Sequence, residues 1–210
     1  MSQTDAKDMK NAPLDIASVD PNFKAAEVGG EPVEYVNAMA GGPFRMTGFP
    51  WQDAAGLPRR LPTDMTSEEV NEGAIFLSQH TSGGQISFRT DSRYIAIRAV
   101  LNVAPHDMNH MPRAGSAGFD FMERTAEGYV FRKVVGPTPQ HLYGDVLEQM
   151  AIPETAERVM RSWRINFPLY GGVRKLEIGV EPGCELEAPE PFALEKPIVL
   201  YGMGNGADKI

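Results

Sequence analysis

The sequence is poor in the features that mark disulfide-linked, membrane-spanning and polyanion-binding proteins. Its only cysteine, Cys184, excludes an intramolecular disulfide, and no apolar run approaches the roughly 18 residues of a membrane span. Lys and Arg number 20 against 28 Asp and Glu, and this net charge of −8 argues against nucleic acids and membranes as partners. The first residues also lack the apolar segment of a signal peptide. We therefore expect a soluble, cytoplasmic protein.

Helical periodicity is equally scarce. Only residues 67–71 and 153–162 are helical candidates, and 21 glycines with 17 prolines interrupt the chain at short intervals. Residues 1–29 mix polar, charged and small side chains without a sustained period, so we expect a poorly ordered N-terminal arm there.

Apolar residues instead alternate with polar ones, which is the period of a half-buried antiparallel strand. The alternation is seen at residues 86–88, 95–103, 119–121, 129–131, 163–169 and 176–180. We predict one hairpin from 119–121 with 129–131 and a second from 163–169 with 176–180. The fold class that follows is all-β, an antiparallel β-sandwich or jelly roll with little helix.

Two histidines lie four residues apart in the segment 106–110, His-Asp-Met-Asn-His, which has the spacing of a zinc protease motif. That spacing brings both imidazoles to one side only on a helix, and Pro105 and Pro112 disfavour a helix here. In an extended segment both histidines would again share one side, as in a surface binding loop. We expect no metal site.

Ser116 lies in Ala-Gly-Ser-Ala-Gly, which approximates the nucleophile elbow of serine hydrolases. An elbow lies between a strand and a helix, whereas a strand pattern follows here, so a turn is the favoured interpretation. A small esterase using Ser116, His110 and Asp120 is kept as a minor alternative.

Residues 202–207, Gly-Met-Gly-Asn-Gly-Ala, match the consensus sequence of the dinucleotide-binding fingerprint. The fingerprint also requires a following helix, a second strand and an acidic residue about 20 positions on, and the sequence stops at Ile210. We expect no cofactor.

Scattered aromatic residues could form a platform on which sugar rings stack, although core packing is their more frequent role. They are Trp51, Tyr129, Tyr143, Trp163 and Tyr170. Trp51 lies in an irregular Pro/Gly stretch and is expected at the surface, whereas Trp163 is on the apolar side of a strand and is expected in the core.

Several segments together resemble a known family. They are Pro50-Trp51, Arg60-Leu61-Pro62, His80-Thr81-Ser82-Gly83-Gly84, Phe88-Arg89-Thr90-Asp91-Ser92, His110-Met111-Pro112, Gly118-Phe119-Asp120-Phe121 and Arg164-Ile165-Asn166-Phe167-Pro168-Leu169-Tyr170. In this order they are similar to the N-terminal β-sandwich domain, with its Gly-x-Asp-Leu-Tyr signature, of SGNH-type (GDSL-like) esterases. One departure is Phe121-Met122 where the signature has Leu-Tyr.

The resemblance implies a sandwich domain over residues 30–195 and, over 196–210, the first strand of an SGNH hydrolase domain that follows in cis in relatives. Met203 and Gly204 stand where those relatives have two serines, of which the second is the nucleophile. Without nucleophile, base and acid there is no serine hydrolysis, so we expect no catalytic residue here. The apolar residues 197–201 would be an unpaired strand, from which we expect homodimerisation.

Two functions remain open at this point. The first is a non-catalytic accessory sandwich that contributes packing or substrate-cleft surface to a hydrolase domain, with an acyl ester as possible ligand. The second is a stand-alone carbohydrate-binding module. The candidate binding residues for either function are polar or aromatic groups in or beside turns: Trp51, His80, His110, Arg113 and Asp120.

Overall fold

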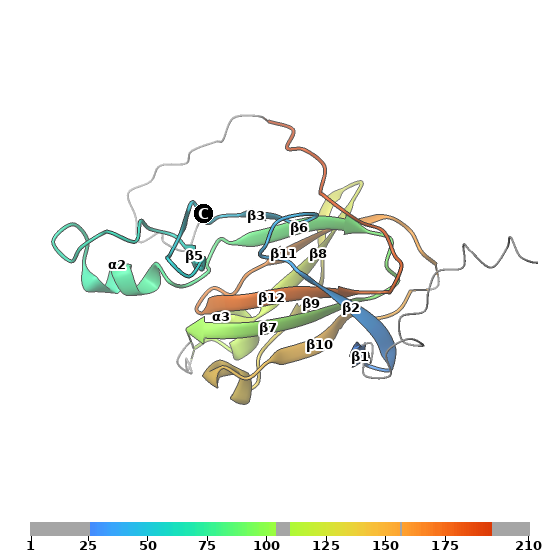
Figure 1. Cartoon of the computed structure of the whole chain (residues 1–210), viewed down its shortest axis with the longest axis horizontal. Helices are drawn as coiled ribbons and strands as arrows, with labels where there is room; N and C mark the ends of the chain where they lie inside the picture. Colours follow the sequence, from blue (N-terminus) through green and yellow to red (C-terminus); the bar gives the residue numbers. More distant parts are fainter. Residues whose placement is uncertain (1–25, 104–109, 156, 195–210) are drawn as a thin grey trace, which may run out of the picture.

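Two antiparallel sheets packed face to face form the body of the molecule in the computed structural model, which describes residues 26–103, 110–155 and 157–194 (Figure 1). One sheet has the strand order β1 (Ala26–Val28), β2 (Glu31–Asn37), β12 (Gly172–Val180), β7 (Ile95–Val103) and β10 (Leu147–Ile152). The other has the order β13 (Leu186–Glu187), β6 (Gln85–Thr90), β11 (Arg161–Asn166), β8 (Phe119–Thr125) and β9 (Gly128–Val135), with β3 (Arg45–Thr47) on the edge of β6. The predicted all-β sandwich is confirmed.

Short elements complete the described part of the chain. They are the strand pair β4 (Trp51–Gln52) and β5 (Pro58–Arg59), the helices α2 (Glu72–Leu77) and α3 (Arg113–Ala117), and the 3₁₀ turn η2 (Gln140–Tyr143). No helix among these described residues is long and apolar enough to cross a bilayer. The expectation of a poorly ordered arm over residues 1–29 is wrong for its last residues, because Ala26–Val28 form strand β1. Residues 1–25 lie outside the described residues, as do residues 196–210.

The core lies between the two sheets because alternate side chains of each strand point inward. From the six-stranded sheet it takes Ile86, Phe88, Phe119, Phe121, Trp163 and Ile165, and from the other sheet Ile95, Ile97, Ala99, Leu176, Ile178 and Val180. Trp163 is 4% exposed, so its expected place in the core is confirmed.

The hairpin expected from residues 119–121 and 129–131 is confirmed, since β8 pairs with β9 in antiparallel register. The second predicted hairpin is wrong. Strand β11 pairs with β6 and β8, whereas β12 pairs with β2 and β7 in the opposite sheet. The segment 167–171 therefore crosses from one sheet to the other, and both strands direct their apolar residues into the same core.

The two helical candidates also need correction. Residues 67–71 form turns, and α2 begins one residue later, where the Asn71 side chain caps it by accepting from the Ala74 amide at 2.8 Å. No described residue between 153 and 160 is helical. The Arg158 side chain instead donates to the Glu181 carboxylate and to the Pro182 and Gly183 carbonyls, which holds this segment against the turn after β12.

An ion cluster around Glu181 closes the end of the sandwich where β6 finishes and β7 starts. Glu181 accepts from Arg93 Nη2 at 2.7 Å and from Arg158 Nε at 3.0 Å, and Arg93 Nη1 also meets Glu154 at 2.6 Å. The Arg93 hydrogen bonds, with help from Arg158, lower the pKa of the Glu181 carboxyl to about 2 although burial opposes them. We call this the Glu181 end.

Candidate functional site

The opposite end of the sandwich is built around the loop from Ser78 to Gly84, which leads from α2 into β6. Thr81 anchors this loop, because its fully buried hydroxyl lies 3.0 Å from the Pro168 carbonyl and 2.8 Å from that of Gly171. The Thr81 amide also donates to the Gly171 carbonyl at 2.9 Å. The loop is thereby fixed to the connection between β11 and β12. We call this the His80 end.

The imidazole of His80 is the unusual group at this end. It is 5% exposed, and its ring lies 5.0 Å from the Phe76 ring and 6.2 Å from the Tyr170 ring, both edge to face. Neither ring nitrogen has a hydrogen-bond partner among the described residues. Burial and, second, the positive charge of Arg60 lower the pKa of His80, so the ring is neutral at pH 7. One N–H donor and one acceptor lone pair are thus buried and unused.

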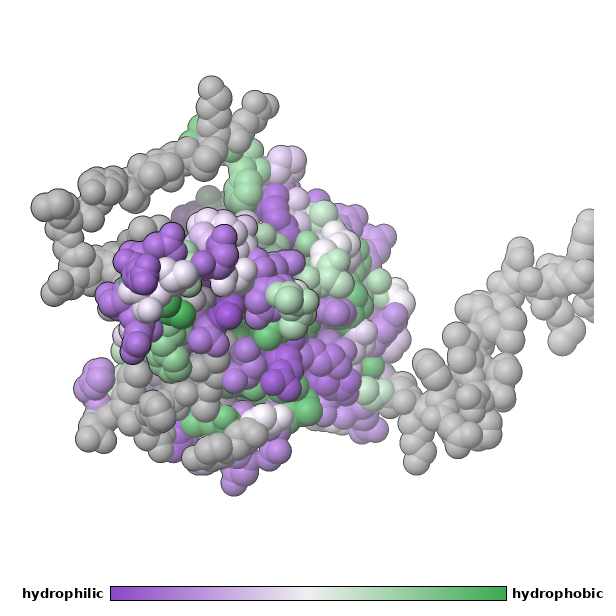
Figure 2. All heavy atoms as spheres, turned by 60° about the vertical axis from the view of Figure 1, so that its left-hand side comes forward, coloured by the Kyte–Doolittle hydropathy of each residue, from purple (hydrophilic) through white to green (hydrophobic). Residues whose placement is uncertain are grey.

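His80 lines a small cavity of about 160 Å³ that opens at the surface. The other lining residues are Arg60, Leu77, Ser82, Met111, Leu169 and Tyr170. Large apolar side chains around it are exposed, among them Phe76 at 48% and Leu169 at 44%. Figure 2 turns the side of the molecule that carries α2 forward and shows green hydrophobic residues there among purple hydrophilic ones. Exposed apolar side chains gathered at one place are typical of a contact surface.

The five predicted binding residues differ in how they are placed relative to this cavity. His80 lines the cavity and His110 is exposed beside the lining residue Met111. Arg113 begins α3, in the turn after Met111. Trp51, in β4, is exposed as expected, at 41%. The small sheet β4–β5 is fastened to this end, since the Arg60 amide donates to the Ser78 carbonyl at 3.1 Å.

Asp120 lies on the outer face of the six-stranded sheet, because its neighbours Phe119 and Phe121 point into the core. It pairs in register with Asn166, whose side-chain oxygen accepts from Gln85 at 3.1 Å. Burial raises the pKa of Asp120, and a hydrogen bond with Asn166 opposes the rise. Asp120 therefore belongs to a polar row beside the His80 end and does not line its cavity.

The sequence around Ser116 does not form a nucleophile elbow. Ser116 lies inside α3, which precedes a strand instead of following one, and the residue is 2% exposed. Its carbonyl accepts from the Tyr170 amide at 2.7 Å. Within the described residues no hydrogen bond joins Ser116 to His110 or Asp120, and the remaining part of the 106–110 motif lies outside them.

No metal-binding group of three or more His, Cys, Asp or Glu side chains exists in the ranges the structure describes. The aromatic residues do not gather into one sugar-binding platform either. Trp163 is in the core, the Tyr129 ring is covered by the Arg164 guanidinium at 3.7 Å from its centroid, and Tyr170 packs beside His80. The Tyr143 side chain is outside the described set.

Sequence reasoning missed the apolar lining of the cavity, which comes from Leu77, Met111 and Leu169. These residues are far apart along the chain, and each by itself is an ordinary apolar residue in a loop or at a helix end. The available signal was indirect: the segments that contain Arg60, His80, Met111 and Leu169-Tyr170 are among those that carry the family resemblance.

Comparison with solved structures supports this fold. A structure described as a GDSL-like lipase from Bacteroides ovatus is similar with a TM-score of 0.61 at 20% identity, over 75% of this chain and 43% of that one. The salicylyl-acyltransferase SsfX3 from a tetracycline biosynthetic pathway is similar with a TM-score of 0.52 at 19% identity, over 76% of this chain and 42% of that one. The chain thus spans less than half the length of either neighbour.

No curated protein matches the sequence. A family model does, and it covers residues 33–186, which include both sheets' central strands and the His80 loop. The chain therefore belongs to the GxDLY family, described as the N-terminus of SGNH-hydrolase-type esterases.

Proposed function

We propose that this chain is a non-catalytic accessory β-sandwich of an SGNH-type esterase-like protein, and that its His80 end supplies packing or substrate-cleft surface to a hydrolase domain. The observation that carries the proposal is the His80 imidazole, which is buried and finds no partner for either nitrogen among the residues that the structure describes. Leaving such a group unsatisfied costs roughly 1–3 kcal/mol. A neighbouring domain, or an acyl ester held between the domains, would offer the missing donor and acceptor.

The course of the chain after β12 also favours the His80 end as the place where a following domain would lie. Strand β13 runs antiparallel to β6, with Leu186 opposite Thr90 and Glu187 opposite Arg89. Further along, the Phe192 ring lies 4.0 Å from the guanidinium of Arg45, on the strand that pairs with the first half of β6. The chain after the sandwich therefore heads toward the start of β6, which follows the His80 loop. A domain joined there in cis would begin near the His80 end.

The surface chemistry suits a protein contact. Phe76, Leu77 and Leu169 are exposed apolar groups around a neutral imidazole, and the central groups of protein interfaces are likewise apolar, with few charges. Among the described residues, Arg60 is the one cation that lines this cavity. Its long side chain can lie along an apolar surface while its charged tip remains in water.

Hydrolysis assays on the 210-residue chain test the non-catalytic part of the proposal. With p-nitrophenyl acetate and butyrate we expect the spontaneous rate only, for the chain and equally for Ser116→Ala and His80→Phe. The reason is that no described hydroxyl, imidazole and carboxylate form a connected nucleophile, base and acid. Turnover above the blank that either substitution abolishes would overturn the proposal.

A further inference from the structure

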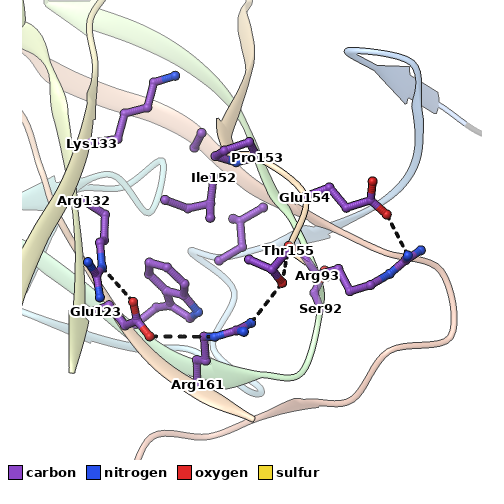
Figure 3. A pocket seen from close by; sticks show the side chains of 13 residues that line it. Ser92, Arg93, Glu123, Arg132, Lys133, Ile152, Pro153, Glu154, Thr155 and Arg161 are labelled. Carbon is purple, nitrogen blue, oxygen red and sulfur yellow. Dashed lines mark hydrogen bonds and ion pairs between the residues drawn. The ribbon is translucent and has the colours of Figure 1, made fainter. Parts of the chain in front are cut away.

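A second cavity, larger than that of His80, lies near the Glu181 end between the edges of the two sheets (Figure 3). Its volume is about 320 Å³, which is near the lower limit of about 300–1,000 Å³ for small-molecule sites. Strands β8, β9 and β11 contribute one wall, and β7 with the end of β10 contributes the other.

The inner wall of this cavity is apolar. Ile95, Ala151 and Trp163 are buried there, and Ile152 adds to the same wall. The Trp163 indole nitrogen is buried, and its N–H has no acceptor among the described residues. An indole N–H can only donate, so this buried group requires an acceptor.

The rim is charged and has an excess of cations. Within the described ranges, it is lined by the cations Arg93, Arg132, Lys133 and Arg161 and by two carboxylates, those of Glu123 and Glu154. In Figure 3, Glu123 is joined to Arg132 and Arg161, and Glu154 to Arg93. Lys133 is joined to none of the side chains drawn, and its ammonium points away from Glu123 and Arg161, toward the outer part of the cavity (Figure 3). The described residues contain no ion pair for it.

The unused hydrogen-bonding groups identified in this cavity are therefore donors. The Lys133 ammonium and the Trp163 N–H both require an acceptor, while both carboxylates already have cationic partners. The local excess of positive charge is notable in a chain whose net charge is −8, and it favours an anion. The apolar wall favours a carbon body behind the anionic group.

We propose that this cavity binds a small organic monocarboxylate with an apolar body. The carboxylate would accept from the Lys133 ammonium at the outer part of the cavity, and the carbon body would extend inward past Ile152 toward the Trp163 ring. This inference does not rest on the accessory role, because the cavity is at the other end of the molecule and uses none of the residues around His80.

The fluorescence of Trp163 provides the test. The sequence has two tryptophans, so in a Trp51→Phe background Trp163 is the only source of tryptophan emission. We expect hexanoate to change this emission saturably with a Kd of roughly 1 mM or lower, equivalent to about −4 kcal/mol. Hexanamide, which has the same body without the charge, should bind at least about 10-fold more weakly, and glucuronate, which has the charge without the apolar body, should do the same.

Two lysine variants in that background complete the experiment. Lys133→Gln should weaken hexanoate binding by about 10-fold, whereas Lys175→Gln, which removes the same charge from an exposed ion pair on β12, should leave it unchanged. Circular dichroism would verify that both variants fold. Equal binding of hexanoate and hexanamide, preferred binding of glucuronate, unchanged affinity in Lys133→Gln, or no saturable response would each overturn the proposal.

Discussion

The two ends of this sandwich are joined by the same strands but differ in how their buried polar groups are satisfied. At the Glu181 end, the buried carboxylate accepts from two guanidinium groups, and the Ser92 hydroxyl and Glu181 amide are also bonded. At the His80 end, a buried imidazole has no partner for either nitrogen within the described part of the chain, and apolar side chains around it face solvent. The contrast teaches that the ion cluster of the Glu181 end is satisfied by groups of the chain itself, whereas the His80 end has the chemistry of a surface that another domain covers.

Removal of the Glu181 charge should have the largest effect on stability. We expect Glu181→Gln to lower the free energy of unfolding by about 1–2 kcal/mol at pH 7, because the partly exposed guanidinium groups of Arg93 and Arg158 lose their shared carboxylate. The depressed pKa also sets the pH range: this contribution is complete above about pH 4.5 and is lost as pH falls toward about 2. Urea unfolding of both proteins between pH 2 and 7 would measure it.

Glu157→Gln is the matched control, since Glu157 is exposed in the segment beside Arg158. We expect its free energy of unfolding to remain within about 0.5 kcal/mol of the unmodified chain. If Glu181→Gln were no more destabilising than this control, the Glu181 end would not be held by the ion cluster.

Replacement of His80 should act in the opposite direction. We expect His80→Phe to raise the free energy of unfolding by about 1 kcal/mol, because an apolar ring of similar shape removes two unsatisfied buried groups. The gain should grow as pH falls below 6.5, since the lowered pKa means that the unfolded chain binds a proton there before the folded one does. Thermal and urea unfolding at pH 8 and pH 5.5 would show it.

His141→Phe offers a matched comparison, because the His141 ring accepts from the Thr138 amide at 3.0 Å. Its loss should lower the free energy of unfolding by up to about 1 kcal/mol. A His80→Phe protein that is destabilised as much as His141→Phe would mean that the His80 nitrogens already have partners within the chain.

Local patterns predicted the strands but not the sheet to which each belongs. The alternation around Trp163 and Ile165 and that around Leu176 and Ile178 look alike, because both sets point into one core from opposite sides. A glycine-containing connection between such strands is compatible with a hairpin or with a crossing between sheets, and here the chain crosses. The β8–β9 hairpin was predictable because its strands are adjacent and its turn is short.

The site was also predictable only in part, because local patterns do not show which distant segments meet in the fold. His80 and His110 were selected as polar residues in or beside turns, and His80 does line a cavity, as does Met111, the neighbour of His110. His80 is buried because the neighbouring Thr81 fixes the loop: its hydroxyl lies within hydrogen-bond distance of carbonyls about 90 residues further along the chain. Arg93 and Glu181 are 88 residues apart in the sequence, and no local pattern around either residue predicts that they pair.

The most direct test of the account is hydrogen–deuterium exchange of the chain with and without an SGNH hydrolase domain from the same organism. The account predicts that amides of residues 76–82 and 168–171, which form the His80 end, become protected when the hydrolase domain is added, while residues 91–94 and 153–155 at the Glu181 end do not change. Protection confined to the Glu181 end, or no protection at either end at concentrations where the domains associate, would contradict it.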